Sequence, residues 1–222
     1  MLFAAGFGTR MGPLTATLPK PMVEVAGRPL VDYALDLVRP MGFSKIVANL
    51  HYKPEALAAH LALNDVALSY EQPDILDTGG GLRAALPLLG TGPVYTMNTD
   101  AIWQGGNPLK YLADAWQPDK MDALLLCIPP ENAQGHAGPG DFVSDAGGNL
   151  VRGRGLIYSG AQIIKTDGLN SVAETAFSLN VLWDRMIERK RLFGLPYPGK
   201  WCDVGQPESI AKAEAMLREP HV

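Results

Sequence analysis

Two segments near the start of the chain combine glycines with positive charge. They are GFGTRM (residues 6–11) and PKPM (residues 19–22). Glycines let backbone N–H groups approach a phosphate chain without a Cβ in the way, and two prolines hold the backbone stiff around the ammonium of Lys20. The pair predicts a phosphate site, although the glycine loop alone also fits a tight turn. It is not a dinucleotide fingerprint, because Met11 takes the sixth position, and no Gly-Lys-Ser/Thr of a Walker loop follows.

The segment LFAAGFGTRM (residues 2–11), followed by PKPM, resembles the signature of the sugar-phosphate nucleotidyltransferases, G-x-G-T/S-R and then P-K-P. These enzymes join a nucleoside triphosphate (NTP) to a sugar 1-phosphate and release pyrophosphate. The resemblance extends over nearly the whole chain. It implies that the nucleotide phosphates are bound by Ala4, Ala5, Gly6, Gly8, Thr9, Arg10 and Lys20, with Arg10 and Lys20 as the catalytic cations.

Two aspartates end short apolar runs that lie far apart in the chain. They are Asp100, in Asn98-Thr99-Asp100, and Asp203, in WCDVG (residues 201–205). Sequence spacing cannot show that they meet. Alone, Asp100 also fits a turn aspartate after a strand, and Asp203 also fits an aspartate that precedes a glycine turn. Mg²⁺ is held by one or two carboxylates together with substrate phosphates. The resemblance therefore implies that Asp100 and Asp203 hold Mg²⁺ as the cofactor.

The expected mechanism follows from charge. A sugar 1-phosphate is already an anionic oxygen nucleophile, so an in-line attack on the α-phosphorus needs no general base. Two polyanions have to be brought together, and pyrophosphate leaves with added charge. We therefore expect positioning and electrostatic stabilisation to supply most of the rate.

A glycine run follows the third predicted strand and resembles a base-binding segment. Glu71-Gln72-Pro73 precedes LDTGGG (residues 76–81), which is similar to the L-E-T-G-G-G of N-acetylmuramate 1-phosphate uridylyltransferases. Such a run lets a nucleobase lie flat on the backbone, and a helix that begins there offers free N–H groups. An ordinary glycine-rich helix start remains an alternative. The resemblance implies UTP as the nucleotide, bound by Gln72, Gly79 and Gly80.

The acceptor side is implied by GDF (residues 140–142) and YSGA (residues 158–161), which resemble sugar-contacting segments of the same enzymes. The sugar-binding residues implied are Asn98, Asp141, Gly160 and Asn180. Many relatives carry Glu-Lys-Pro after the Gly-Asp region, but this chain has VRGR (residues 151–154), which fits the compact muramate-type enzymes. Trp103 and Trp183 could stack on a sugar, but the preferred interpretation of each is a core or rim residue. The histidines (His51, His60, His136 and His221) lack metal-ligand spacing and are assigned no role.

Apolar, β-prone runs alternate with helical patterns along the chain. Strands are expected at 2–5, 45–50, 66–71, 93–97, 122–128, 156–164 and 201–204, with short ones near 142 and 150; helices are expected at 30–41, from 54, from 80 or 81 to 89, at 108–116, at 178–189 and from 207. This alternation predicts an α/β fold with a parallel sheet and helices on both faces. The resemblance implies a single-domain Rossmann-like three-layer sandwich with a mostly parallel mixed sheet. Ligands bind at the carboxyl ends of such strands, where Gly6, Asn98 and Asp100 lie.

Composition limits the remaining possibilities. Residues 1–222 are expected to form one domain, with a nucleotide-binding half at 1–128 and an acceptor half at 129–222. A net charge of −4 argues against non-specific nucleic-acid binding, and no apolar run approaches the roughly 20 residues of a spanning helix. The cysteines, Cys127 and Cys202, are expected to be reduced, buried thiols of a cytoplasmic protein. We expect an NTP and a sugar 1-phosphate as partners, with no nucleic acid, no membrane, and a monomer or weak homo-oligomer.

Both ends of the chain carry an expectation of their own. The first strand has no lead-in, so the chain is expected to begin inside this strand or to start upstream of Met1. The chain stops soon after Leu217, which favours a single activity without an appended regulatory or acyltransferase domain.

The same residues also fit several other functions. The same chemistry could use GTP with a mannose or heptose phosphate, dTTP with glucose 1-phosphate, or CTP with phosphocholine. A non-catalytic nucleotide-sugar sensor is the main alternative of another class, although such a protein would be expected to lose Lys20 or a metal aspartate. A dinucleotide-dependent oxidoreductase is disfavoured by Met11.

Overall fold

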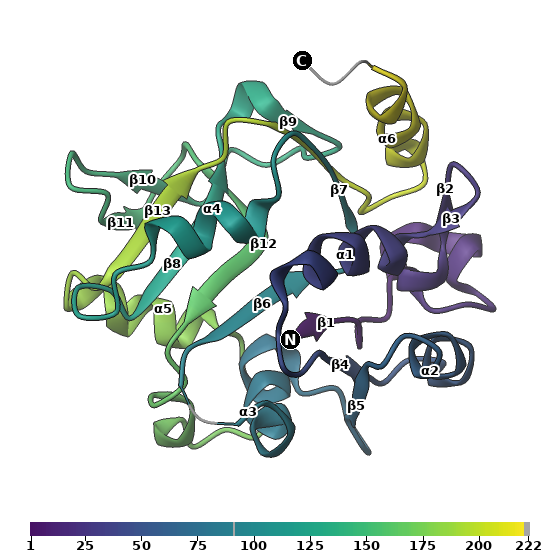
Figure 1. Ribbon diagram of the computed structural model, residues 1–222, viewed down its shortest axis with the longest axis horizontal. Helices are drawn as coiled ribbons and strands as arrows, with labels where there is room; N and C mark the ends of the chain where they lie inside the picture. Colours follow the sequence, from purple (N-terminus) through teal and green to yellow (C-terminus); the bar gives the residue numbers. More distant parts are fainter. Residues whose placement is uncertain (91, 220–222) are drawn as a thin grey trace.

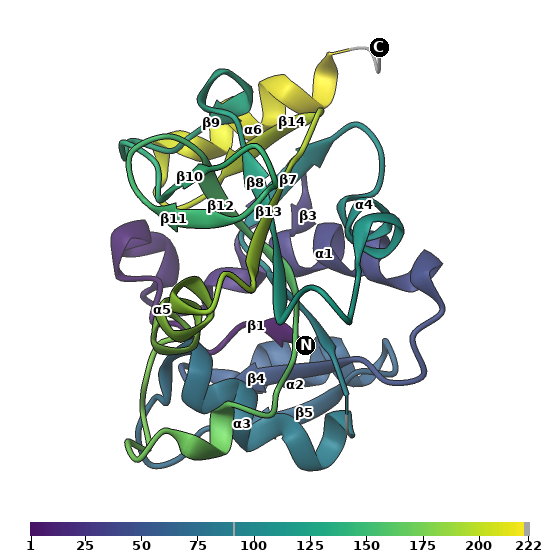
Figure 2. The same ribbon diagram turned by 90° about the vertical axis from the view of Figure 1, so that its left-hand side faces the viewer.

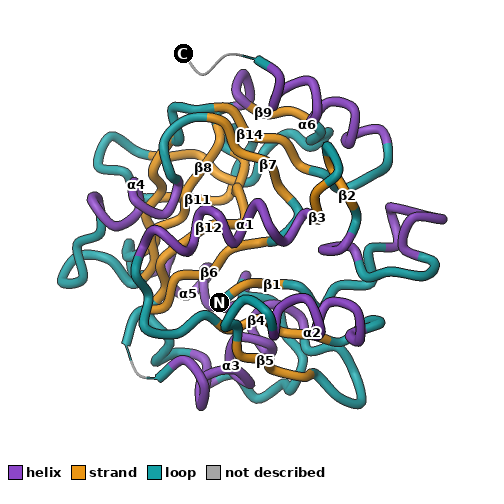
Figure 3. Tube along the Cα trace, turned by 45° about the vertical axis from the view of Figure 1, so that its right-hand side comes forward, coloured by secondary structure: helices purple, strands orange, loops and turns teal. Residues whose placement is uncertain are grey.

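A mixed sheet forms the centre of the computed structural model, which describes residues 1–90 and 92–219 (Figure 1). Its strands are β1 (Leu2–Phe3), β4 (Val47–Leu50), β5 (Ala67–Tyr70), β6 (Val94–Asn98), β8 (Ala123–Ile128), β12 (Ile157–Ile164) and β13 (Leu192–Pro196). Their order is β13-β8-β12-β6-β1-β4-β5, and Figure 3 shows β1 between β6 and β4. β12 runs antiparallel to both of its neighbours, whereas the other neighbouring pairs are parallel. The predicted α/β fold with a mostly parallel mixed sheet is confirmed.

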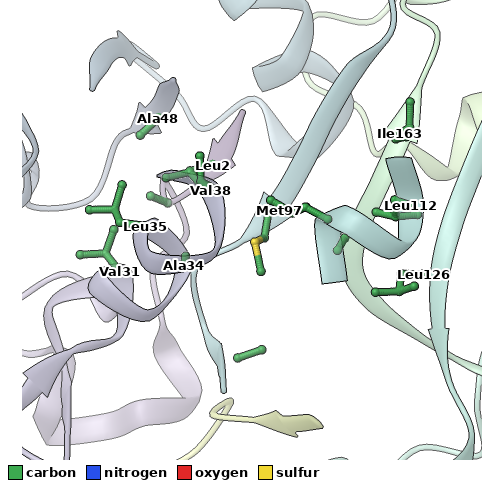
Figure 4. Close-up of a cluster of buried hydrophobic side chains, with 14 of the residues drawn as sticks. Leu2, Val31, Ala34, Leu35, Val38, Ala48, Met97, Leu112, Leu126 and Ile163 are labelled. Atoms are coloured by element: carbon green, nitrogen blue, oxygen red, sulfur yellow. The ribbon is translucent and has the colours of Figure 1, made fainter. Parts of the chain in front are cut away.

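Helices cover both faces of this sheet. They are α1 (Leu30–Val38), α2 (Pro54–Ala62), α3 (Asp77–Leu89), α4 (Pro108–Ala115) and α5 (Asn180–Glu188). β8 shows the two faces most clearly, because its side chains alternate between two cores. Leu124 and Leu126 belong to the core that contains α1, α2 and α4, part of which is drawn in Figure 4. Leu125 and Cys127 belong to the core that contains α3 and α5.

A smaller sheet lies at one end of the molecule. It contains β7 (Ala101–Gln104), β14 (Lys200–Asp203) and β9 (Ala133–Gln134), and α6 (Glu208–Arg218) packs against it. Figures 1 and 2 both place α6 at the end opposite α3 and β5. The remaining short elements are the hairpins β2 (Glu24–Val25)–β3 (Arg28–Pro29) and β10 (Phe142–Ser144)–β11 (Leu150–Arg152), and 3₁₀ helices at Thr9–Thr15, Lys20–Met22, Arg39–Met41, Pro130–Asn132 and Leu169–Ser171.

Some element boundaries differ from those expected. The first strand ends at Phe3 rather than at residue 5, because the N–H of Ala4 donates to the Asn49 side chain instead of to a strand. The helix expected from Gly80 or Gly81 already begins at Asp77. β7 and β13 were not predicted. β7 is a short strand directly after the bend at Asp100, and Gly and Pro interrupt the pattern of β13.

The antiparallel strand β12 contains a bulge that shapes the sheet's carboxyl edge. Its register with β8 shifts between Tyr158 and Gln162. Gly160 lies inside this bulge with φ +87°, a conformation that favours glycine. A Cβ added there would lie 2.7 Å from Cγ of Asn98. The bulge therefore makes room for the Asn98 side chain at the end of β6.

The two cysteines are free and buried, as expected from the sequence. Burial raises the pKa of Cys127 to about 12 and that of Cys202 to about 11, so both are thiols at neutral pH. Within the described residues, we find no helix with the length and apolar character needed to cross a membrane.

Candidate active site

The clamped lysine pairs with the first aspartate. Lys20 lies between Pro19 and Pro21 at the start of a 3₁₀ turn and is only 8% exposed. Its Nζ donates to Oδ2 of Asp100 at 2.6 Å. An ammonium has three N–H donors, so two remain available beyond this ion pair. The predicted cation and the predicted metal ligand thus occupy one place at the carboxyl end of β6.

The smaller sheet brings the second aspartate to the same place. β14 pairs with β7 so that Asp203 lies opposite Ala101, the residue after Asp100. The N–H of Val204 also donates to the carbonyl oxygen of Asp100 at 2.9 Å. Two acids that are distant in the sequence are therefore held together by backbone pairing. This juxtaposition could not be read from the sequence.

The electrostatics around Asp203 show how close the charged groups lie. Burial raises the pKa of Asp203, and the negative charge of Asp100 raises it further. Electrostatic interactions with Lys20, Arg10 and His136 lower the pKa of Asp203 without cancelling this rise. Gly205 keeps the space between the acid and the arginine open, because a Cβ there would lie 3.0 Å from Asp203 Oδ2 and 3.2 Å from Arg10 Nη1.

These groups suit a hard divalent cation. Asp100 and Asp203 are two adjacent carboxylates whose mutual repulsion a cation would relieve. No cluster of three or more His, Cys, Asp and Glu side chains that could enclose a metal exists among residues 1–90 and 92–219. Two carboxylates with the remaining positions left to phosphate and water are what Mg²⁺ uses at phosphoryl-transfer sites. The donor set therefore fits Mg²⁺.

A buried hydrogen-bond network lies behind the glycine loop. Glu71 and Asn49 are 1% and 3% exposed. Asn49 Oδ1 accepts from the N–H of Ala4 at 2.8 Å, and its Nδ2 donates to Glu71 Oε1 at 2.6 Å. Glu71 Oε2 accepts from the N–H of Leu76 at 2.7 Å. This chain of bonds ties the end of β1 to the segment before α3, and Asn49, a polar residue in an apolar strand, was not predicted as part of the site.

A pocket of about 240 Å³ opens in front of this network. It is lined by Phe3, Ala4, Ala5, Gly6, Lys20, Pro21, Asn49, Glu71, Ile75, Asp77, Thr78, Asn98, Thr99 and Asp100. Of the predicted nucleotide-binding residues, Ala4, Ala5, Gly6 and Lys20 belong to this lining. We refer to it below as the nucleotide pocket.

The other predicted nucleotide-binding residues lie around this pocket rather than in it. Gly8 has φ +63°, and a Cβ there would lie 2.9 Å from Lys20 Cβ, so this glycine lets the loop close on the lysine stem. Thr9 and Arg10 are exposed on the loop. Gln72 lines a neighbouring depression with His51 and Pro73.

The interpretation of the glycine run was wrong in one respect. The N–H groups of Gly79 and Gly80 are not free, because both donate to the carbonyl oxygen of Phe177, at 2.8 and 3.0 Å. Both glycines are buried. A Cβ on Gly79 would collide with the Phe177 ring. Close packing of α3 on the segment before α5 therefore accounts for these glycines.

A second pocket of about 320 Å³ adjoins the first and shares Phe3, Asp77, Thr78 and Asn98 with it. The remaining lining residues are Asp141, Phe142, Arg152, Tyr158, Ser178, Leu179, Asn180 and Trp183. Three predicted sugar-binding residues, Asn98, Asp141 and Asn180, thus line one cavity, and Gly160 lies beside it against Asn98. We call this cavity the acceptor pocket. Arg152 was not predicted to be part of it.

The tryptophans and histidines complete the comparison with the sequence. Trp183 is buried, donates to Gln162 and also lines the acceptor pocket, whereas Trp103 packs against Tyr197 and Trp201. His51 contacts the Glu71 carbonyl oxygen and His60 pairs with Asp32. His136, which was assigned no role, lies close enough to Asp203 to affect its pKa. His221 lies outside the described residues.

The chain belongs to the MobA-like NTP transferase family, whose model matches residues 1–160. Within that class, it is similar to the N-acetylmuramate α-1-phosphate uridylyltransferase of Caulobacter vibrioides, with 37% identity over 99% of this chain and 96% of that protein. The protein of the same name from Neisseria meningitidis serogroup B is 31% identical over 97% of this chain and 96% of its own length.

A solved structure supports the fold. The crystal structure of HddC from Yersinia pseudotuberculosis, complexed with GMP-PN, superposes with a TM-score of 0.77 at 20% identity and covers 98% of both chains. The family model and the two curated relatives confirm the resemblance inferred from the sequence and the enzyme class, a nucleotidyltransferase.

Proposed function

We propose that the protein transfers UMP from UTP to N-acetylmuramate 1-phosphate, or a similar sugar 1-phosphate, in a Mg²⁺-dependent reaction that releases pyrophosphate. The observation that carries this proposal is the convergence of Lys20, Arg10, Asp100 and Asp203 at the carboxyl end of β6, whose last residue, Asn98, lines both the nucleotide and the acceptor pocket. The names of the two relatives, N-acetylmuramate α-1-phosphate uridylyltransferases, support both the sugar and the uridylyl group.

The residues of the site have separable tasks. Asp100 and Asp203 would hold Mg²⁺, which neutralises charge on the reacting phosphates when it is bound. The two N–H groups of Lys20 that Asp100 leaves free, together with the Arg10 guanidinium, would stabilise the departing pyrophosphate. The sugar phosphate oxygen is anionic at neutral pH, so no side chain has to remove a proton. This division of tasks requires no general base between the two pockets.

The two halves of the chain would serve the two substrates. Residues 1–128 supply most of the nucleotide pocket, and residues 129–222 supply the outer wall of the acceptor pocket. Asp203 is the exception, since it comes from the second half and lies beside Asp100. We further propose a cytoplasmic enzyme that acts as a monomer or weak homo-oligomer and binds neither nucleic acid nor membranes. Two buried free thiols and a net charge of −4 support this view.

A pyrophosphate-release screen tests the proposal. UTP, GTP, CTP and dTTP are each combined with N-acetylmuramate 1-phosphate, mannose 1-phosphate, glucose 1-phosphate and phosphocholine, with and without Mg²⁺. We expect the highest kcat/KM for UTP with N-acetylmuramate 1-phosphate and no turnover in EDTA. A higher kcat/KM for another pair would reject the proposed substrates. Nucleotide binding without turnover of any pair would identify a sensor.

A further inference from the structure

We propose that Arg152 is a specificity-determining residue of the acceptor pocket and binds a carboxylate on the sugar. The inference rests on the proposed function, because it assigns the occupant of the acceptor pocket. Arg152 is the last residue of β11, in the hairpin β10–β11. Gly153 and Arg154 follow this hairpin directly.

The guanidinium of Arg152 is held in a fixed plane. It lies 4.8 Å above the ring of Phe142 and 5.7 Å from the ring of Trp183, two buried residues that also line the pocket. Its Nε donates to Asp184 Oδ1 at 2.9 Å, and its Nη2 donates to Asn180 Oδ1 at 2.8 Å. Stacking and paired hydrogen bonds restrict an arginine far more than a lone surface charge is restricted.

This arrangement leaves part of the guanidinium available to a ligand. An arginine has five N–H donors. Nε and Nη2 are directed to Asp184 and Asn180. Across residues 1–90 and 92–219, no protein acceptor is recorded for Nη1 of Arg152. A side chain that lines a cavity, is oriented by its neighbours and keeps two unused N–H donors is suited to an anionic group.

Among the described residues that line the pocket, Arg152 is the one cation that would attract an anion. Asp77 and Asp141 line the same cavity. Each already accepts from a backbone N–H, of Thr78 and Tyr158 respectively, and can accept further bonds from sugar hydroxyls. A carboxylate placed near these acids would be repelled, whereas one placed against Arg152 would be attracted. The cations assigned to the departing pyrophosphate, Lys20 and Arg10, do not line this pocket.

The chemistry of the proposed acceptor matches this cation. N-Acetylmuramate is N-acetylglucosamine with a lactyl ether, and that ether ends in a carboxylate. The two sugar 1-phosphates therefore differ by the group that Arg152 would bind. A hydrogen bond to a charged group corresponds to a preference of about 10- to 100-fold between them.

The experiment compares the two acceptors in the full-length protein. We would measure kcat/KM with UTP and Mg²⁺ for N-acetylmuramate 1-phosphate and for N-acetylglucosamine 1-phosphate, and the Kd of each by calorimetry. The variants are Arg152→Gln, Arg152→Lys and, as a matched control, Arg154→Gln, an exposed arginine of the same segment. We expect Arg152→Gln to lower kcat/KM for the muramate about 10- to 100-fold and to change that for the glucosamine by less than about 3-fold.

The outcomes separate this inference from the proposed function. If Arg152→Gln lowers kcat/KM equally for both acceptors, Arg152 only supports the fold of the pocket. If kcat/KM changes for neither acceptor, Arg152 does not take part in recognising the sugar. Arg152→Lys should recover only part of the preference, because an ammonium cannot bond Asp184 and Asn180 in the same plane. If neither acceptor is turned over but the muramate binds more tightly through Arg152, the proposed function fails and this inference stands. Equal Kd values in the wild type would overturn it.

Discussion

The buried Asn49–Glu71 pair allows a prediction that follows from counting donors and acceptors. In Glu71→Gln the side chain keeps its shape, but one acceptor oxygen becomes a donor. If the new NH₂ faces Leu76, the N–H of Leu76 loses its acceptor. If it faces Asn49, that amide has to flip to accept from it, and the N–H of Ala4 loses its acceptor instead. Either orientation leaves one buried backbone N–H without a partner.

The expected cost is that of one unsatisfied buried donor, about 1–3 kcal/mol in the free energy of unfolding. For a chain of this length, each kcal/mol corresponds to roughly 2–4 °C in Tm. We therefore expect Glu71→Gln to lower the Tm by about 2–12 °C. Because Ala4 lines the nucleotide pocket, the KM for the nucleotide should rise as well. Urea unfolding and pyrophosphate release measure the two effects.

A second substitution provides the decisive control. Asn49→Asp alone places two carboxylates against each other with no donor between them, so it should destabilise the fold at least as much. In the double variant Asn49→Asp/Glu71→Gln, the new carboxylate accepts both from the N–H of Ala4 and from the new side-chain amide, and the oxygen of that amide accepts from the N–H of Leu76. The swapped pair therefore satisfies every group and keeps the same net charge. A double variant whose loss equals the sum of the two single losses would refute this reasoning.

Three further predictions concern the site. Lys20→Met should lower kcat by about 10²- to 10³-fold. The control Lys110→Met, on an exposed helix surface, should leave kcat unchanged. A loss below about 10-fold for Lys20→Met would argue against an electrostatic role for Lys20. Asp203→Asn should abolish turnover yet raise the Tm of the metal-free protein. The pKa of Asp203 in the folded protein is raised above 3.8, so ionisation of Asp203 destabilises the fold as the pH increases through the raised pKa. The gain in Tm of Asp203→Asn over the wild type should therefore be absent in acid and grow toward neutral pH. Gly160→Ala should lower the free energy of unfolding by more than about 1 kcal/mol, because φ is positive and the new methyl group meets Asn98. Urea unfolding measures this loss, and the KM for the acceptor should rise as well. An unchanged KM would show that the bulge has no part in acceptor binding.

The sequence was informative where a local pattern carries the signal. The continuous apolar run of β8 predicts a strand buried on both faces, and the stiff Pro-Lys-Pro segment predicts a fixed lysine. Both features depend only on residues adjacent in the chain. The fold class follows from the same kind of regularity, repeated from one element to the next.

Other features depend on pairing between distant segments and could not be predicted from local patterns. The meeting of Asp100 and Asp203 requires β7 to pair with β14, a strand far along the chain. Free N–H groups were expected at Gly79 and Gly80 because Phe177, whose carbonyl oxygen accepts from both, lies far along the chain. Arg152 was missed because its neighbours in the pocket, Asn180 and Trp183, come from α5.

The position of β12 has a consequence for how the chain is made. β12 separates β6 from β8, so these two strands are joined only through residues 157–164. A nascent chain that has emerged only to residue 128 has an open gap in the middle of its sheet, with unpaired backbone groups on both sides. The ribosome must therefore deliver the segment through residue 164 before the sheet can close. For the same reason, we expect a fragment of residues 1–128 to leave β6 with an open edge and β8 without a neighbour in the sheet.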